Sequence, residues 1–307
     1  MKQFSICTLF EKDYHLGLAV FINSLAAHDF SGNIWAGYRG VLPPWLAHLK
    51  PGKETQSYIL TEKISLHFIE LHTEKHLTNY KPDFMLDVLN TYDPDCEGLF
   101  YFDPDIVIKN DWNVFVDWVK WGPLLCEDVN SPLDKSHPLR KLWIDCYKKY
   151  NLLLKSNKDV YVNGGFVGLK RTDADFLVYW KNIQDIMSEE IGGLKDWCLK
   201  DRSFLFSMTD QDALNISIME DREVTILGRN AMDIIPGGYF MSHALGAFKP
   251  WRTSYITNAF KGISPSMTDK LFWQYSNFLL KPYSDFDCGL KKINLKIASL
   301  ISRFIKR

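Results

Sequence analysis

The sequence predicts an α/β fold, with a mostly parallel central sheet flanked by helices. The first observation is an apolar, strand-like segment over residues 4–10, followed by a short polar turn and by residues 14–28, whose apolar side chains recur at helical spacing. A strand, a turn and a helix in this order begin a parallel α/β unit. The second observation is the run over residues 99–102, whose continuous aromatic and aliphatic side chains are typical of a buried strand.

Composition narrows the class of protein. The chain has 307 residues, of which 46% are hydrophobic and 24% charged, with a formal net charge of −1. This balance is ordinary for a globular protein and gives no reason to expect nucleic acid as a partner. Six scattered cysteines without a Cys-x-x-Cys pair argue against a zinc site and favour a reducing compartment. Without a signal-peptide core or a run of about 20 apolar residues, we expect a cytoplasmic protein.

The same patterns predict the remaining elements in chain order. Residues 31–75 alternate short apolar stretches with Gly and Pro, which indicates strands and loops in uncertain register. Thr209 is expected to be the N-cap of a helix that begins at Asp210. The other expected elements are helices over residues 83–89, 112–118 and 173–187, and strands over residues 122–126, 160–169 and 224–227.

The segment Asp103-Pro104-Asp105 directly follows the apolar run. Two carboxylates at the end of a buried strand are costly to bury unless something pairs them, and a divalent cation takes carboxylate oxygens directly. The alternative is an ordinary turn, because Asp-Pro-Asp is common turn chemistry. On this segment alone, both interpretations stay open.

The chain is expected to divide into a main domain over residues 1–255 and a helical tail over residues 256–307. Within the main domain, the polar and helical residues 129–160 are a candidate lid or acceptor-binding insertion. The tail ends in residues 289–307, which contain six basic residues and no acidic one. This amphipathic segment either lies on an anionic membrane or docks on its own domain, and the sequence leaves both open. Its apolar stripe comprises Leu290, Ile293, Ile297, Leu300, Ile301, Phe304 and Ile305.

Four separated motifs need one explanation: the aspartate pair, Asn163-Gly-Gly, the hexapeptide Asp-Gln-Asp-Ala-Leu-Asn over residues 210–215, and His-x-x-Gly-x-x-Lys-Pro-Trp over residues 243–251. Together, in this order, they resemble the nucleotide-sugar glycosyltransferases of the GT-A fold. Within that fold they resemble family 8, the retaining glycogenin-like and lipopolysaccharide galactosyltransferase-like enzymes. The similarity extends from the first strand and Tyr14 to Trp251, and the last motif is complete. Gly164 stands where the family often has Ala.

The resemblance implies a metal site and a diphosphate site. Asp103, Asp105 and His243 would hold the metal, and this mixture of carboxylates and imidazole suits Mn²⁺, with Mg²⁺ as the alternative. Gly246 would let a backbone N–H approach a phosphate, and Lys249 would place a positive charge on it.

The resemblance also implies sites for the base and the sugar of the donor. Thr8 and Tyr14 would lie beside the base, and Lys81 would lie near the donor sugar. Asn163, Asp210 and Gln211 would contact the sugar ring near its anomeric carbon. We assign Asp210 and Gln211 to catalysis by positioning and by stabilising an oxocarbenium ion, and leave open which group, if any, is a nucleophile.

The implied activity is metal-dependent, retaining transfer of a hexosyl unit from a nucleotide sugar, expected to be a UDP-sugar. The acceptor is expected to be a glycan or a lipid-linked saccharide in polysaccharide biosynthesis, with peripheral membrane contact through the basic tail. One alternative is a haloacid-dehalogenase-type phosphatase, because the Asp103–Val107 segment also fits the shape of its nucleophile motif. Another is a non-catalytic nucleotide-sugar-binding protein on the same fold.

Overall fold

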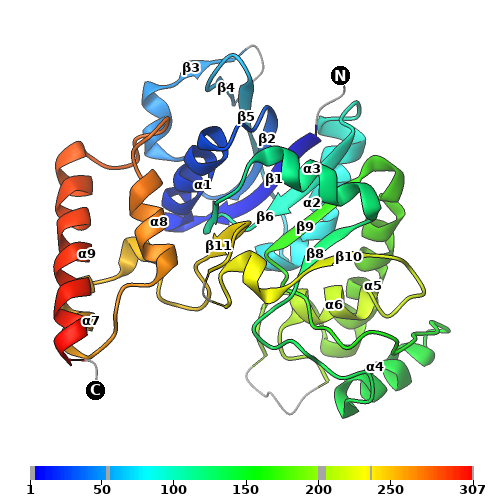
Figure 1. Ribbon diagram of the computed structural model, residues 1–307. Helices are drawn as coiled ribbons and strands as arrows, with labels where there is room; N and C mark the ends of the chain where they lie inside the picture. The colour runs from blue at the N-terminus through cyan, green and yellow to red at the C-terminus, as the bar shows by residue number, and fades with distance from the viewer. Residues whose placement is uncertain (1–3, 53–55, 200–204, 236, 306–307) are drawn as a thin grey trace.

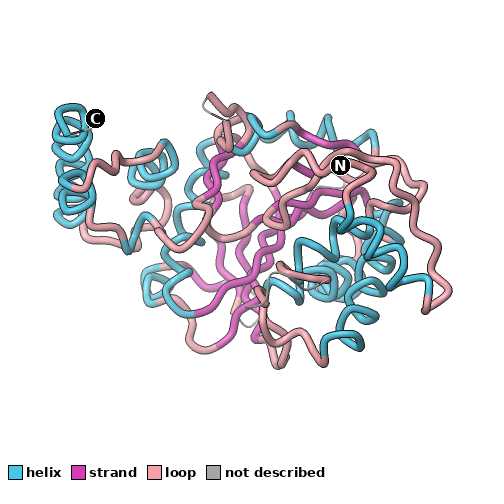
Figure 2. The backbone as a smooth tube through the Cα atoms, turned by 90° about the horizontal axis from the view of Figure 1, so that it is seen from below, coloured by secondary structure: helices cyan, strands magenta, loops and turns pink. Residues whose placement is uncertain are grey.

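The computed structural model describes residues 4–52, 56–199, 205–235 and 237–305. Within these residues a nine-stranded sheet has the order β10-β8-β9-β6-β1-β2-β5-β4-β3. Figure 2 shows its strands crossing the middle of the molecule, with helices on both sides. The strands of this sheet are β1 (Phe4–Glu11), β2 (Gly32–Arg39), β3 (Lys50–Pro51), β4 (Ser57–Ile59), β5 (Ile64–Glu70), β6 (Gly98–Phe102), β8 (Leu124–Cys126), β9 (Phe166–Lys170) and β10 (Thr225–Leu227).

Strand direction confirms the predicted α/β class. Strand β1 pairs in parallel with β2 and β6, β2 with β5, and β10 with β8. Among the described strands of this sheet, β9 and β4 run against the others, since both pair antiparallel with their neighbours. The carboxyl ends of the parallel strands therefore meet at one edge of the sheet, where open α/β sheets bind ligands.

Two hydrophobic layers cover the sheet, and alternate residues of β6 serve each layer. Leu99 and Tyr101 face a layer that contains apolar residues of α2, α4, α5 and α6. Phe100 and Phe102 face the layer that contains α1 and α3. The helices are α1 (His15–Ala27), α2 (Lys81–Asp87), α3 (Trp112–Trp118), α4 (Pro138–Lys148), α5 (Asp175–Ile191), α6 (Thr209–Ser217), α7 (Tyr255–Phe260), α8 (Met267–Tyr275) and α9 (Asp285–Ile305).

Several predicted elements begin one or more residues away from the expected position, and two of these differences have a clear physical reason. The strand predicted over residues 160–169 begins only at Phe166, because the amides of Val162 and Gly164 donate to the side chains of Asn215 and Gln211 rather than to a neighbouring strand. Helix α2 begins at Lys81 rather than at residue 83, since Pro82 is accommodated in the first turn, where its missing N–H is not needed. Residues 129–160 contain one helix, α4, and their role as a lid or acceptor-binding insertion stays a prediction.

The three C-terminal helices pack beside α1 at one end of the molecule (Figure 1). Helix α9 docks through a face that includes Leu295 and Ala298, so docking of the tail on its own chain is confirmed. The opposite face leaves Ile293 and Leu300 each 55% exposed. Among the described residues, no helix combines the length and the hydropathy that crossing a membrane requires.

Candidate active site

The turn at Asp103-Pro104-Asp105 lies between β6 and β7 (Ile106–Ile108), at the ligand-binding edge of the sheet. The amide of Ile106 donates to the carbonyl of Asp103 (3.1 Å), which closes a four-residue turn. The turn interpretation is therefore confirmed, and the turn aims both carboxylates into one cavity. Asp105 is 5% exposed, and Asp103 is partly exposed.

A second, two-stranded ladder brings His243 to the two aspartates. Strand β11 (Met241–His243) pairs antiparallel with β7, with His243 opposite Ile106, the residue after Asp105. His243 Nε2 lies 3.2 Å from Asp105 Oδ1 and 3.7 Å from Asp103 Oδ2. One ligand atom from each of the three residues falls within 4.8 Å of the others, as ligands around one ion do. This donor set of two carboxylates and one imidazole fits a divalent cation such as Mn²⁺ or Mg²⁺.

Lys249 lies on the same side of the site. Its ammonium donates to Asp105 Oδ2 (2.5 Å) and to the carbonyl of Ala244 (2.6 Å). Burial alone would raise the pKa of Asp105, but His243 and the Lys249 ammonium together lower it well below its usual range. Burial alone would lower the pKa of Lys249, but the Asp105 carboxylate raises it. Asp105 and Lys249 are therefore both charged at neutral pH.

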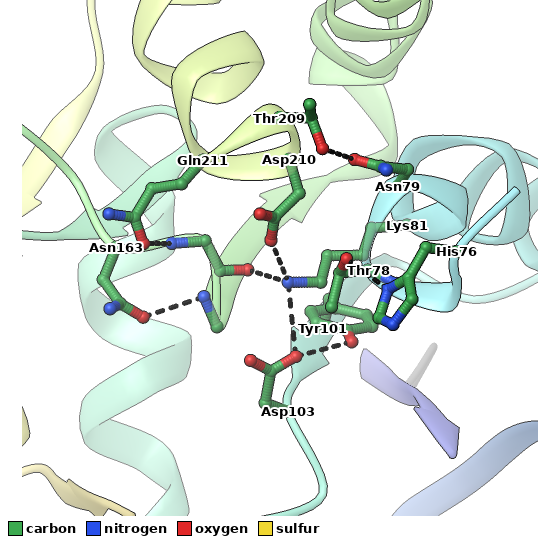
Figure 3. Close-up of polar contacts among 12 residues, drawn as sticks. His76, Thr78, Asn79, Lys81, Tyr101, Asp103, Asn163, Thr209, Asp210 and Gln211 are labelled. Atoms are coloured by element: carbon green, nitrogen blue, oxygen red, sulfur yellow. Dashed lines mark hydrogen bonds and ion pairs between the residues drawn. The ribbon is translucent and has the colours of Figure 1, made fainter. Parts of the chain in front are cut away.

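Lys81 is the centre of a buried polar cluster (Figure 3). Its ammonium donates to the carbonyl of Gly164 (2.7 Å) and to Asp210 Oδ2 (3.0 Å), and lies 3.3 Å from Asp103 Oδ1. Asp103 Oδ1 also accepts a hydrogen bond from the hydroxyl of Tyr101 (2.7 Å). Burial would lower the pKa of Lys81, but Asp103 and Asp210 raise it, so the ammonium stays charged. The single ammonium thus joins a candidate metal ligand to a candidate catalytic carboxylate.

The segment Asn163-Gly164-Gly165 is fixed on both sides. Asn163 Nδ2 donates to Asp128 Oδ2 (2.7 Å), and Asn163 Oδ1 accepts from the amide of Gly165 (2.8 Å). The carbonyl of Gly165 accepts from the amide of Asp103 (2.8 Å). A Cβ at Gly165 would lie 2.6 Å from His243 Cε1 and 2.9 Å from Asp103 Oδ2, so only glycine leaves room for the metal ligands.

Helix α6 presents Asp210 and Gln211 from its first turn. Gln211 Oε1 accepts from the amide of Gly164 (3.1 Å), whereas the buried Gln211 Nε2 has no hydrogen-bond partner among the described residues. The prediction that Thr209 caps this helix is wrong: Met208 is the N-cap, and Thr209 is the first helical residue. The Asp212 carboxylate accepts from the amides of Ser207 (2.8 Å) and Met208 (2.9 Å), the two residues before the helix.

These side chains surround one cleft with a volume of about 540 Å³. Thr8 and Lys81 do not line it: Thr8 is fully buried in β1, and Lys81 lies behind the two aspartates that it pairs. Asp128 does line the cleft but was missed from the sequence, although it follows a predicted strand as the aspartate pair does. The other predicted site residues all line the cleft: Tyr14, Asp103, Asp105, Asn163, Asp210, Gln211, His243, Gly246 and Lys249.

Comparison with solved structures identifies the fold. The bifunctional glycosyltransferase WbbM matches with a TM-score of 0.56 at 14% identity, over 95% of this chain but 52% of its own. GlyE of Streptococcus pneumoniae TIGR4 matches with a TM-score of 0.54 at 12% identity, over 97% of this chain and 64% of its own. The galactosyltransferase LgtC, in complex with donor and acceptor sugar analogues, matches with a TM-score of 0.54 at 14% identity, over 93% of this chain and 99% of its own.

The chain therefore spans a little over half of WbbM and just under two thirds of GlyE, but nearly the whole of LgtC. No protein-family model and no curated protein matches the sequence. At these identities the matches establish the GT-A glycosyltransferase fold, as the sequence motifs predicted, and they give no support to the phosphatase alternative.

Proposed function

We propose, on the premise that this chain has the glycosyltransferase GT-A fold, that it moves a hexosyl unit from a UDP-sugar to a saccharide acceptor with retention of configuration and with a divalent cation. The observation that carries the proposal is the convergence of Asp103, Asp105 and His243 on the cleft that also contains Asp210 and Gln211. Fold alone does not imply activity, whereas this set supplies both a cation site and polar groups for a reacting sugar.

Departure of the nucleoside diphosphate is the charge-separating part of the reaction. Asp103, Asp105 and His243 would hold the cation, which acts as a Lewis acid on the diphosphate when bound. Lys249, on the Asp105 side of the site, would donate to a phosphate oxygen as a point charge. Gly246 has a φ of +75°, a backbone conformation that glycine adopts readily and other residues rarely adopt. Its backbone N–H would approach a phosphate oxygen. Tyr14 lines the cleft and would lie beside the base.

The sugar would lie against the opposite wall, between Asn163 and helix α6. Gln211 Nε2 is a buried donor without a partner among the described residues, so a sugar oxygen would satisfy it. Asp210 Oδ2 accepts a hydrogen bond from the Lys81 ammonium (3.0 Å), and a negative charge on this carboxylate would stabilise an oxocarbenium-like transition state. Lys81 acts on the sugar through Asp210 in this proposal, rather than by touching it as the family resemblance implied.

We also propose that the acceptor is a glycan or a lipid-linked saccharide and that α9 contacts an anionic membrane surface. The residues Leu290, Ile293, Ile297 and Leu300 form one stripe on the face opposite Leu295, and each is at least 44% exposed. By helical spacing, Lys292, Lys296 and Arg303 flank this stripe. Residues 289–307 contain six basic residues and no acidic side chain, a charge that favours contact with an anionic bilayer.

Donor hydrolysis tests the proposed function without a known acceptor. A panel of UDP-, GDP- and ADP-sugars with Mn²⁺ is expected to show release of free sugar from a UDP-hexose, and NMR is expected to show the α-anomer first when the donor is α-linked. Asp210→Asn is expected to lower this rate at least about a hundredfold, because it removes the charge beside the anomeric carbon. Metal-dependent UDP binding without turnover of any nucleotide sugar would favour the non-catalytic alternative. Release of the β-anomer first would contradict retention.

A further inference from the structure

Part of the cleft lining is not used by the proposed donor site. Trp197, Val129 and Asn130 line the same cleft as the candidate donor-binding residues, but none of them belongs to that site. Trp197 is 47% exposed and Val129 is 52% exposed. A half-exposed indole in a cleft leaves apolar surface in water, and such surface at a binding site commonly contacts a ligand.

The backbone of Trp197 is held rigidly, although its side chain is exposed. Its carbonyl accepts from the amide of Thr209 (3.0 Å), the first residue of α6. The carbonyl of the preceding residue, Asp196, accepts from Asn79 Nδ2 (3.1 Å) and from the hydroxyl of Thr209 (3.0 Å). These bonds attach the backbone at Trp197 to the first turn of the helix that carries Asp210 and Gln211.

We propose that Trp197 forms the acceptor subsite, and that its indole stacks on the apolar C–H face of a pyranose ring. This inference rests on the proposed function and names the acceptor's chemical class at that site: a saccharide with an exposed ring face. A pyranose has one face of C–H groups and a rim of hydroxyls, which matches an aromatic ring bordered by polar groups. Asn130 also lines the cleft, and the side-chain carbonyl of this residue, whose Nδ2 donates to Asp128 Oδ1 (2.7 Å), offers a hydrogen bond to the rim.

The position of the indole also fits the direction of transfer. Asp210 and Gln211 would face the anomeric carbon, and the acceptor hydroxyl must approach that same carbon. A ring stacked on Trp197 would lie next to this pair in the cleft, because Thr209 joins Trp197 to the first turn of α6. The donor would contact the metal ligands, Lys249 and Tyr14 through its nucleotide, and Asn163, Asp210 and Gln211 through its sugar, but it would not contact Trp197. Loss of the indole is therefore expected to affect the acceptor and to spare the donor.

Saturation-transfer NMR tests this inference with methyl β-glucoside, methyl β-galactoside and methyl β-N-acetylglucosaminide as probes, in the presence of UDP. Mg²⁺ replaces Mn²⁺, which is paramagnetic and would broaden the signals. For the wild type, we expect saturation of the ring C–H protons of at least one probe. For Trp197→Ala, we expect this saturation to fall about tenfold, and for Trp197→Phe to be largely kept. Trp121→Ala is the matched control, because Trp121 is 78% exposed and does not line the cleft.

The rate of donor hydrolysis by Trp197→Ala is expected to stay within about twofold of the wild type. Water replaces the saccharide acceptor in this reaction and does not stack on the indole. Equal probe saturation in the wild type and Trp197→Ala would overturn the inference, as would no probe saturation in a sample whose UDP is bound. Failure of the proposed function would give a different result, because UDP itself would then show no metal-dependent saturation. That result would overturn both the proposed function and the acceptor subsite.

Discussion

His243 Nε2 lies 3.2 Å from Asp105 Oδ1, although 138 residues (243 − 105) separate the two in the chain. The short β11–β7 ladder makes this contact, because it sets His243 opposite Ile106 and lets the amide of Ala244 donate to the carbonyl of Asp105 (3.2 Å). Backbone pairing of the neighbouring residues thus supports the side-chain contact between His243 and Asp105. A cation site built on such a ladder is preorganised before any ligand arrives.

Gly165→Ala is expected to disrupt the metal site while leaving the fold intact. The new Cβ would lie 2.6 Å from His243 Cε1 and 2.9 Å from Asp103 Oδ2, so at least one ligand must move. Overpacking of this kind costs about 1–3 kcal/mol of stability. Calorimetry with Mn²⁺ and UDP is expected to show binding weakened at least about tenfold.

Gly289→Ala is the matched control for this substitution. No heavy atom lies within 4 Å of a Cβ at Gly289, which is a helical position in α9. Replacing a helical glycine by alanine is expected to stabilise the protein by about 0.5–1 kcal/mol and to leave UDP binding unchanged. Unaltered metal-dependent binding by Gly165→Ala would contradict the assignment of Asp103 and His243 as ligands of one ion.

Lys81→Met is expected to reduce both stability and turnover. It removes the ammonium that pairs with Asp103 and Asp210, so both carboxylates lose this cation. The buried carbonyl of Gly164 also loses the hydrogen bond that Lys81 donates. Breaking a buried ion pair from one side costs about 3–5 kcal/mol, which thermal unfolding will detect. The double variant with Asp210→Asn is expected to regain part of this stability, because one of the two carboxylates that lost their cation is then replaced by a neutral amide. Equal stability of Lys81→Met and the wild type would contradict the cluster.

Much of the fold was predictable, because it depends on local patterns. The strand and helix at the N-terminus and the buried run before Asp103 have periodicities that any α/β protein shows. The start of β9 was not predictable, since the amide of Gly164 pairs with Gln211, a residue 47 positions away. The burial of Lys81 was not predictable for the same reason, because lysines usually lie at the surface and only three distant partners explain its burial.

Helix α9 is expected to bring the protein to anionic vesicles and not to neutral ones. Ile293→Ser with Ile297→Ser removes apolar surface from the exposed stripe and is expected to weaken co-sedimentation with phosphatidylglycerol-containing vesicles. Lys292→Ser with Lys296→Ser is expected to weaken it about tenfold or more, since each basic residue near an anionic surface contributes about 1 kcal/mol.

Val178→Ser on α5 is the control for the vesicle experiment, because Val178 is 57% exposed and lies far along the chain from the tail. The wild type is expected to stay monomeric in sedimentation at the same concentrations. Equal binding to neutral and anionic vesicles, or a dimer abolished by the Ile293 and Ile297 substitutions, would contradict the membrane proposal.

The residues of the candidate site that belong to sequence motifs were predictable. Asp103, Asp105 and His243 belong to motifs, and the structure brings them together. Asp128 and Trp197 belong to none of the four motifs, and only the fold places them on the cleft. The family resemblance placed Thr8 beside the base, whereas its side chain is fully buried in β1 and does not line the cleft.

Calorimetric titration of UDP into the protein, with Mn²⁺ and then with EDTA, tests the central claim most directly. We expect binding with Mn²⁺ and at least about tenfold weaker binding with EDTA, because the diphosphate would lose its bridging cation. His243→Ala is expected to bind UDP as weakly with Mn²⁺ as the wild type does with EDTA. UDP affinity that is the same with Mn²⁺ and with EDTA would contradict the account.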